Sequence, residues 1–264
     1  MKYTYEDLAK MIDHSLLHPT MTDQELEDGC RLAAKYGVAS VCIKPYAVKR
    51  AAELLKGSGV VVGAVIGFPH GNSATESKRY ETELACRDGA TEIDMVINIG
   101  KALGGDWDYV ARDIQVVCAE AHGRGAKVKV IFENDYLTKG GAGLSSDEFK
   151  RKLCELCEKA GADWVKTSSG YGFVKQPDGS YNYKGATEHD LALMRASVSA
   201  KVQVKAAGGV RDLDGLIKVR DLGGSRCGAT ATAAMLDEYR RREAAEKSGA
   251  DASGGTAKLG AGGY

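Results

Sequence analysis

Eight short apolar segments recur along the chain, and each is followed by a stretch with the spacing of an amphipathic helix. The segment 60–66 is apolar at almost every position, which is typical of a strand buried on both faces of a parallel sheet. Glycines such as Gly37 and Gly161 lie between a helix and the next strand, where they suit a short turn. The strands are expected at 12–17, 38–44, 60–66, 91–97, 127–133, 163–166, 202–205 and 225–227.

Eight strand–helix units in a chain of 264 residues favour a (β/α)8 TIM barrel over an open doubly wound sheet, which usually has fewer strands. A short helix at 3–11 is expected before the barrel. Thr22 and Glu25 have the spacing of a capping box at the start of the first barrel helix. The helices after the strands are expected at 22–36, 46–56, 74–88, 106–123, 146–160, 187–198, 212–221 and 229–246.

Two segments depart from this alternation. Residues 173–184 carry Pro-Asp-Gly between two short β-prone arms, which predicts a β-hairpin inserted after the sixth strand. The hairpin could cover the pocket, contact another subunit, or simply decorate the surface. Residues 247–264 are rich in Ser, Ala and Gly, which predicts a flexible tail after a single catalytic barrel domain at 1–246.

The charge balance argues against several classes of partner. Lys plus Arg and Asp plus Glu both number 36, so bulk electrostatics give no support for a nucleic-acid or membrane-surface partner. No apolar run approaches the ~20 residues that span a bilayer. The first residues lack the apolar core of a signal peptide, so we expect a cytoplasmic protein.

The seven cysteines are odd in number and scattered, so reduced and mostly buried thiols are expected. Cys154 and Cys157 form a C-x-x-C, but they fall in a helical pattern with no second Cys/His pair nearby, which disfavours a redox or zinc site. The sequence contains no H-E-x-x-H, G-x-G-x-x-G or Walker A motif. No metal or other cofactor is therefore expected.

Among the ionisable residues of the expected strands, five stand out inside apolar sequence: Asp13, Asp94, Lys129, Lys166 and Lys205. Glu92, by contrast, lies near the entrance of its strand. Taken singly, each is consistent with a structural ion pair, and a lysine at a strand end can also extend its amine into solvent. Together they are costly unless they compensate one another or perform chemistry. Polar residues at the carboxyl ends of barrel strands converge on one mouth, so the set favours an active site.

Two close lysines allow amine catalysis. At pH 7, a lysine of ordinary pKa is neutral in only about four molecules in ten thousand. Burial and a second ammonium nearby lower that pKa and can raise the neutral fraction roughly a thousandfold. A neutral Lys166 beside Lys205, with Asp94 to shuttle a proton, is the set that a Schiff-base aldolase needs.

Glycines indicate where the far end of a substrate would bind. Gly208 and Gly209 follow the seventh strand, and Gly228-Ala229-Thr230 is expected to open the helix after the eighth. Loops after these strands, with a helix N-terminus, form the common phosphate site of barrels, and Gly170 could add a backbone N–H. Glycine pairs are also frequent in ordinary turns, so position in the strand order carries this interpretation.

Seven motifs occur in order along the chain: Ile-Asp-His-Ser-Leu-Leu, Ala-Ser-Val-Cys-Ile-Lys-Pro, Val-Ile-Gly-Phe-Pro-His-Gly, Glu-Ile-Asp-Met-Val-Ile-Asn-Ile-Gly, Val-Lys-Val-Ile-Phe-Glu, Val-Lys-Thr-Ser-Ser-Gly and Val-Lys-Ala-Ala-Gly-Gly-Val-Arg. In this order they resemble the deoxyribose-phosphate aldolases, which are class I aldolases with a barrel fold. The resemblance runs from about residue 8 to residue 236. It therefore covers almost the whole expected domain.

The resemblance implies that Lys166 forms the Schiff base, that Lys205 tunes it and that Asp94 transfers protons. It also implies that the pocket is lined by Asp13, Ser15, Cys42, Lys129 and Ser169. The implied reaction is the reversible cleavage of 2-deoxy-D-ribose 5-phosphate to acetaldehyde and D-glyceraldehyde 3-phosphate without a metal. The remaining alternatives are a Schiff-base barrel aldolase for another sugar or keto-acid phosphate, and a non-catalytic barrel that binds a phosphosugar. A homodimer or higher homo-oligomer is expected.

Some positions depart from the family pattern. Ser169 stands where the family usually has Thr, and Ala206 where it often has Ser or Pro. Ala231 removes one hydroxyl from the loop after the eighth strand, so weaker discrimination for phosphate is expected. The 173–184 hairpin is longer than the family's usual loop. Tyr264 is a candidate contact to the pocket, since some family members use a C-terminal tyrosine in this way, although a tail without such a contact is an equal alternative.

Overall fold

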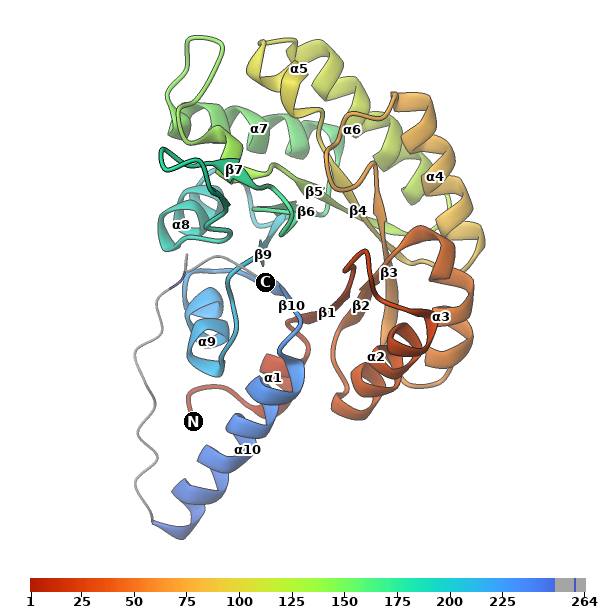
Figure 1. Ribbon diagram of the computed structural model, residues 1–264, viewed down its shortest axis with the longest axis vertical. Coiled ribbons are helices and arrows are strands. Elements are labelled where there is room, and N and C mark those ends of the chain that lie inside the picture. Colours follow the sequence, from red (N-terminus) through yellow and green to blue (C-terminus); the bar gives the residue numbers. More distant parts are fainter. Residues whose placement is uncertain (250–258, 260–264) are drawn as a thin grey trace.

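Eight parallel strands close into a barrel in the computed structural model, which describes residues 1–249 and 259 (Figure 1). Around the barrel the strand order is β1-β10-β9-β6-β5-β4-β3-β2, so each strand pairs with its neighbours in the (β/α)8 succession. The expected barrel is confirmed. Its strands are β1 (Ile12–Leu16), β2 (Ser40–Ile43), β3 (Val61–Ile66), β4 (Glu92–Val96), β5 (Lys127–Ile131), β6 (Trp164–Lys166), β9 (Gln203–Ala207) and β10 (Arg226–Ala229).

The helices surround the barrel on its outer side (Figure 1). Two short 3-10 helices, η1 (Pro45–Ala47) and η2 (Asn134–Leu137), follow β2 and β5. A short helix at Ile99–Leu103 was not expected from the sequence. The α-helices are α1 (Tyr5–Ala9), α2 (Asp23–Tyr36), α3 (Val48–Leu55), α4 (Thr75–Arg87), α5 (Ile99–Leu103), α6 (Trp107–His122), α7 (Ser146–Ala160), α8 (Glu188–Ala196), α9 (Leu213–Asp221) and α10 (Thr232–Ser248).

Local signals explain where the barrel helices begin and end. The Thr22 hydroxyl accepts the Glu25 N–H while the Glu25 carboxylate accepts the Thr22 N–H, which completes the expected capping box of α2. Gly37 ends this helix in a left-handed conformation with φ 64°. Such caps give the short, defined turns that return the chain to the next strand.

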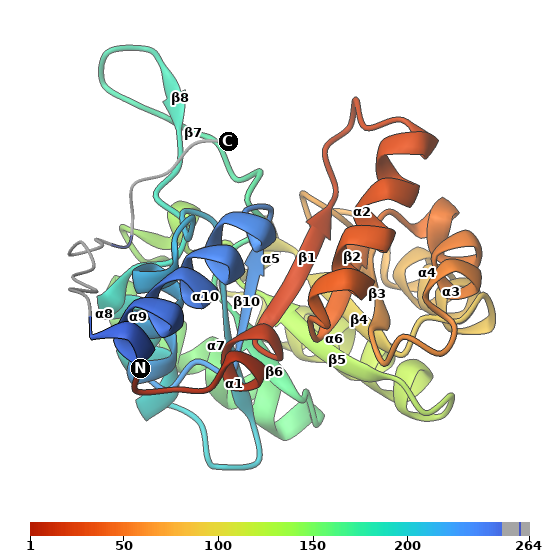
Figure 2. The same ribbon diagram turned by 90° about the horizontal axis from the view of Figure 1, so that it is seen from below.

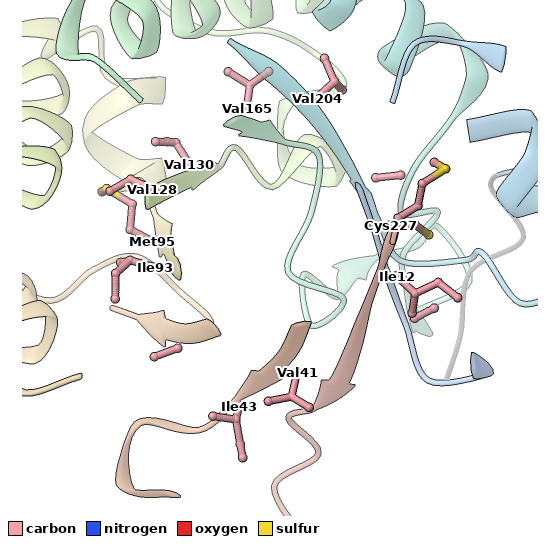
Figure 3. Packing of buried hydrophobic residues seen from close by; sticks show 14 of the residues in the cluster. Ile12, Val41, Ile43, Ile93, Met95, Val128, Val130, Val165, Val204 and Cys227 are labelled. Atoms are coloured by element: carbon pink, nitrogen blue, oxygen red, sulfur yellow. The ribbon is translucent and has the colours of Figure 1, made fainter. Parts of the chain in front are cut away.

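Alternation along the strands separates the core from the site. Ile93 and Met95 of β4 point outward toward the helices (Figure 3). Asp94 between them points into the barrel, where it contacts lysines of three other strands. The core therefore lies between the barrel and its helices. The parallel register pairs Asp94 with Lys129 and Lys166 with Lys205, so charged side chains of neighbouring strands lie at similar heights inside.

Two expected boundaries were wrong. Gly228 and Ala229 belong to β10, where Gly228 pairs with Ala207, and α10 starts only at Thr232. The fifth strand ends at Ile131 and not at Glu133, because Glu133 adopts a left-handed conformation with φ 60° and leads into η2. Both corrections matter for the site, since these residues face its mouth.

The expected hairpin is present as β7 (Val174–Lys175) and β8 (Tyr181–Asn182), which pair antiparallel. It stands beside the barrel on the side toward which β1 and β10 point (Figure 2). The last helix continues to Ser248, beyond the domain boundary expected at 246. The expected flexible tail and Tyr264 fall on residues 250–258 and 260–264, outside the described residues. No described helix is long and apolar enough to cross a membrane.

Candidate active site

Three buried side chains meet at the carboxyl end of the barrel. The amines of Lys166 on β6 and Lys205 on β9 each lie 2.7 Å from the same oxygen, Oδ2, of Asp94 on β4. Lys166 is 2% exposed and the other two are fully buried. The structure thus brings together the three residues expected to carry the chemistry, across three strands.

A second tier of charges lies deeper in the barrel. The Lys129 amine contacts Asp13 at 2.8 Å, Glu92 at 2.6 Å and Asp94 at 3.1 Å. Arg226 bridges Asp13 at 2.5 Å and Glu92 at 2.6 Å. Asp13 also contacts the Lys205 amine at 2.5 Å, so the two tiers form one continuous network.

The network shifts the pKa values of Lys166 and Lys205 in opposite directions. Burial lowers the pKa of Lys166 below its ordinary value and the charge of Lys205 lowers it further, while Asp94 opposes both. Burial also disfavours charge on Lys205, but Asp13 and Asp94 outweigh it and raise the pKa of Lys205. The expected effect of Lys205 is therefore present, although burial is the larger cause.

Asp94 remains a carboxylate in this setting. Burial by itself would favour its protonated form, but the amines of Lys129, Lys166 and Lys205 hold the pKa of Asp94 well below its usual range. A carboxylate that contacts two amines can exchange protons between them and a bound reactant.

A cavity of about 330 Å³ opens above the two amines of Lys166 and Lys205. The other expected binding residues that line it are Ser15, Cys42, Ser169, Gly170, Gly208, Gly209, Gly228, Ala229 and Thr230. Asp13 and Lys129, expected to line the pocket, lie instead beneath it in the second tier of charges. They can act on a substrate only through the residues above them.

The glycines give the cavity a rim of bare backbone. Gly170, Gly208 and Gly209 have φ angles of 88°, 80° and 80°, a region that other residues rarely adopt. Backbone N–H groups at such positions suit a phosphate. Arg211, which the sequence reading did not single out, also lines this cavity and adds a cation near the same rim.

Glu133 is a buried residue that sequence reasoning missed. Its carboxylate accepts the Ser169 N–H at 3.2 Å and also the Ser169 hydroxyl. Burial raises the pKa of Glu133 to about 7, against the opposing hydrogen bonds from Ser169. The signal was a carboxylate next to an apolar run, as for Asp94, but Glu133 was assigned to the end of the strand and given no role.

Glu92 and Arg226 were also missed. The sequence assigned Glu92 to the entrance of its strand and gave Arg226 no role. Both point into the barrel, where Arg226 lies 5.2 Å from the Trp164 ring centre. Only the barrel closure shows that β10 and β4 face each other here, since no short sequence spacing links them.

The C-x-x-C lies away from this site. Cys154 and Cys157 are buried free thiols on α7, and burial raises the pKa of Cys154 to about 12. Within residues 1–249, no group of three His, Cys, Asp or Glu side chains is arranged to hold a metal ion. Burial and the raised pKa of these thiols disfavour the thiolate form that redox chemistry and zinc binding use.

A closed barrel with buried amines beneath a cavity at the carboxyl ends of its strands defines an α/β-barrel enzyme. Comparison with known proteins narrows this class. Residues 8–233 match the family described as DeoC/LacD family aldolase. The chain belongs to this family.

Several relatives are similar over nearly their whole length. A deoxyribose-phosphate aldolase from Rhodopirellula baltica is 51% identical over 91% of this chain and 92% of its own. One from Thermococcus gammatolerans is 44% identical over 90% of this chain and 98% of its own. A solved structure of the Aeropyrum pernix deoxyribose phosphate aldolase, described as a unique tetramer, superposes with a TM-score of 0.76 at 29% identity, covering 90% of this chain and 92% of that one.

Proposed function

We propose that this protein reversibly cleaves 2-deoxy-D-ribose 5-phosphate to acetaldehyde and D-glyceraldehyde 3-phosphate through a Schiff base on Lys166. The observation that carries the proposal is the buried Lys166 amine, whose pKa is lowered and which lines the cavity 2.7 Å from Asp94. The relatives named deoxyribose-phosphate aldolase support the choice of substrate.

The charge balance of the network favours a neutral Lys166. Four basic side chains, those of Lys129, Lys166, Lys205 and Arg226, contact only three acidic ones, those of Asp13, Glu92 and Asp94. Loss of one proton therefore leaves the buried network neutral. Lys166 has a single carboxylate partner whereas the other three bases have at least two, so it is the base that releases its proton most readily.

The neutral Lys166 amine attacks the C1 aldehyde of the open-chain sugar, and loss of water leaves an iminium ion. A base then removes the C3 hydroxyl proton. The C2–C3 bond breaks, its electron pair moves into the iminium as an enamine, and D-glyceraldehyde 3-phosphate leaves. Asp94, directly or through water, is the group we assign to proton transfer. Protonation of the enamine at C2 and hydrolysis release acetaldehyde and restore the amine.

The phosphate of the substrate fits the glycine rim. Gly208 and Gly209 follow β9, Gly170 follows β6, and all three line the cavity, so we assign their backbone N–H groups to the phosphate. Arg211 supplies positive charge there. Ser15, Cys42 and Ser169 also line the cavity, and we assign them to the sugar portion of the substrate.

The decisive test is reductive trapping. Incubation with 2-deoxy-D-ribose 5-phosphate and borohydride should add a reduced adduct to the peptide that contains Lys166, as read by peptide mass. The Lys166→Met variant should give neither adduct nor turnover. An adduct with a different carbon skeleton from a keto-acid or ketose substrate would favour another Schiff-base aldolase. Binding without any adduct would indicate a non-catalytic barrel.

Independence from metals and other cofactors stays a prediction. The proposed steps use an amine as electron sink, so no Lewis acid is needed to polarise the aldehyde. Dialysis against EDTA should leave kcat unchanged. A loss of activity that added divalent metal restores would contradict this.

We further propose a homo-oligomer in the cytoplasm. The tetrameric Aeropyrum pernix relative supports self-association, and the seven free cysteines suit a reducing compartment. Analytical ultracentrifugation should give a mass of at least twice that of the 28.0 kDa chain, and cell fractionation should recover the protein with cytoplasmic markers. A monomeric mass would contradict the first proposal.

A further inference from the structure

The base of the hairpin inserted between β6 and α8 reaches the cavity. The tip of the hairpin, at residues 176–180, extends away from the barrel (Figure 2). Tyr181 on β8 is 63% exposed, whereas Tyr183, two residues later, is only 5% exposed. Tyr183 lines the same cavity as Lys166. The base of the hairpin, defined here as residues 183–185, is therefore part of the site although its tip is not.

The ring of Tyr183 lies against the glycine rim. A Cβ added to Gly208 would come within 3.2 Å of a ring carbon of Tyr183. On another side, the ring packs edge-on against Phe173 with centroids 5.3 Å apart. The Gly208 carbonyl accepts the Ala186 N–H at 3.1 Å, which ties the hairpin base to the same loop. The Tyr183 ring thus forms a fixed wall beside Gly208.

The segment after β5 holds both ends of the insert. The Asp135 carboxylate accepts the N–H groups of Lys184 at 2.6 Å and Gly185 at 3.0 Å. The Tyr136 hydroxyl donates to the Phe173 carbonyl at 3.1 Å. Because Asp135 and Tyr136 follow Glu133, which binds Ser169, one short segment positions the whole loop behind Lys166.

We propose that Tyr183 is a specificity-determining residue that bounds the phosphate-bearing end of the substrate, and that Asp135 is a positioning residue that holds it there. This rests on the function proposed above, because it assigns an occupant to the rim beside Gly208. The ring excludes water from that end and limits its width. The three-carbon phosphorylated part of the sugar contacts the ring, whereas acetaldehyde, which ends two carbons from Lys166, does not.

The test compares two substrates in matched variants. Tyr183→Ala removes the wall, and Tyr181→Ala is the control, an exposed tyrosine on the same hairpin outside the cavity. Steady-state turnover of 2-deoxy-D-ribose 5-phosphate measures the whole site, and borohydride trapping of acetaldehyde on Lys166 measures the amine alone. We expect Tyr183→Ala to raise KM for the phosphosugar about tenfold. Its acetaldehyde trapping, and both readouts of Tyr181→Ala, should stay within about twofold of the parent protein.

Two further variants test whether the Tyr183 ring itself is required and whether Asp135 positions it. Tyr183→Phe keeps the ring, so its KM for the phosphosugar should stay within about threefold of the parent value. Asp135→Asn weakens the hydrogen bonds from the Lys184 and Gly185 N–H groups. Like Tyr183→Ala, it should raise KM for the phosphosugar and retain acetaldehyde trapping.

Other outcomes overturn the proposal. An unchanged KM in Tyr183→Ala means that the ring does not bound the substrate. An equal loss of acetaldehyde trapping and sugar turnover means that the ring only supports the fold. Failure of the proposed function is distinguishable from both, since the parent protein itself would then give no adduct on Lys166.

Discussion

At the scale of single residues, the chemistry depends on which lysine loses its proton. Lys166 and Lys205 are both buried and share Asp94, yet the pKa of Lys166 is lowered and that of Lys205 is raised. The difference arises because Asp13 contacts Lys205 and not Lys166. One additional carboxylate partner therefore separates the nucleophile from the group that tunes it.

Removing the charge of Lys205 should shift the pH profile. Lys166 reacts as the neutral amine, so its trapping rate should rise with pH and level off below the ordinary lysine pKa of 10.5. In Lys205→Met the positive charge beside Lys166 is gone, and Asp94 is shared only with Lys129, so the midpoint should move to higher pH. At neutral pH the trapping of acetaldehyde should fall by up to about tenfold for each unit of that shift. An unmoved midpoint would show that Lys205 does not act through the Lys166 charge.

Glu133 should couple stability to pH. Its pKa rises from 4.5 to about 7 on folding because its carboxylate is buried. The protonated form therefore stabilises the fold at low pH, and this contribution is lost as the pH rises from about 4.5 through about 7. The full loss is on the order of 3 kcal/mol.

Urea unfolding of the parent protein and of Glu133→Gln measures this coupling. Between about pH 5 and about pH 8, the parent should lose about 2–3 kcal/mol more than the variant, because Gln does not ionise. All other titrating groups are common to both proteins and cancel in the comparison. Parallel pH dependence of the two proteins would contradict the raised pKa.

At the scale of elements, the loop between β10 and α10 departs most from the family pattern. Ala231 is the N-cap of α10, lines the cavity and makes no side-chain capping bond. The start of a helix attracts anions through its unpaired N–H groups. Ala231 therefore occupies a place where a hydroxyl would meet both the helix start and a phosphate.

Ala231→Ser should strengthen phosphate binding. The added hydroxyl donates to the phosphate, so KM for 2-deoxy-D-ribose 5-phosphate should fall by about threefold to tenfold, corresponding to about 1 kcal/mol. KM for free 2-deoxy-D-ribose should not change, since that substrate has no phosphate to bind. A parent enzyme that already prefers the phosphosugar as strongly as relatives with Ser here would argue against the missing-hydroxyl hypothesis.

The hairpin should divide into a dispensable tip and a functional base. Replacing residues 176–180 with an Asn-Gly turn keeps the Lys175 and Tyr181 pair and should leave kcat and KM within about twofold. Deleting 174–183 removes Tyr183 and should raise KM for the phosphosugar about tenfold. Altered turnover in the tip variant would instead support a flap, and a changed number of subunits in its assembly would support an oligomer contact.

At the scale of the whole molecule, the buried charges also hold the barrel closed. Arg226 on β10 contacts Asp13 on β1 and Glu92 on β4, across the interior of the barrel. Lys129 on β5 contacts the same two carboxylates. Strands far apart in the chain are thus joined through one network, so damage there should affect the entire fold.

Arg226→Met should destabilise the protein by about 3–5 kcal/mol, because it leaves buried carboxylates with incomplete partners. Arg31→Met is the matched control: its ion pairs with Glu27 and Asp28 lie on the surface of α2, where solvent screens them, so its loss should be much smaller. Urea unfolding of the two variants gives both values. Equal losses would show that the buried network is no more important than a surface pair.

Local sequence signals predicted the barrel, the hairpin and most of the element order, because strand burial, helix capping and turn residues each act over a few positions. Thr22 with Glu25, the apolar run of β3 and Pro-Asp-Gly at 177–179 each act over a few residues. The predicted strand boundaries were wrong where a single residue has a left-handed backbone, as at Glu133, and where a strand continues through a glycine, as at Gly228. Such details depend on the partners that the neighbouring strand presents, and periodicity does not contain them.

The sequence by itself determined the nucleophile candidate and its two partners, since charged residues inside apolar strands are rare enough to stand out. Only the tertiary structure decided which of them face the cavity and which lie beneath it. Asp13 and Lys129 proved to be the support for Lys205 and Asp94. Tyr183, Glu133 and Arg226 joined the site although the sequence had given none of them a role there. The physical reason is barrel closure: it sets the distances between residues that the chain separates widely, and those distances determine each pKa and each wall of the cavity.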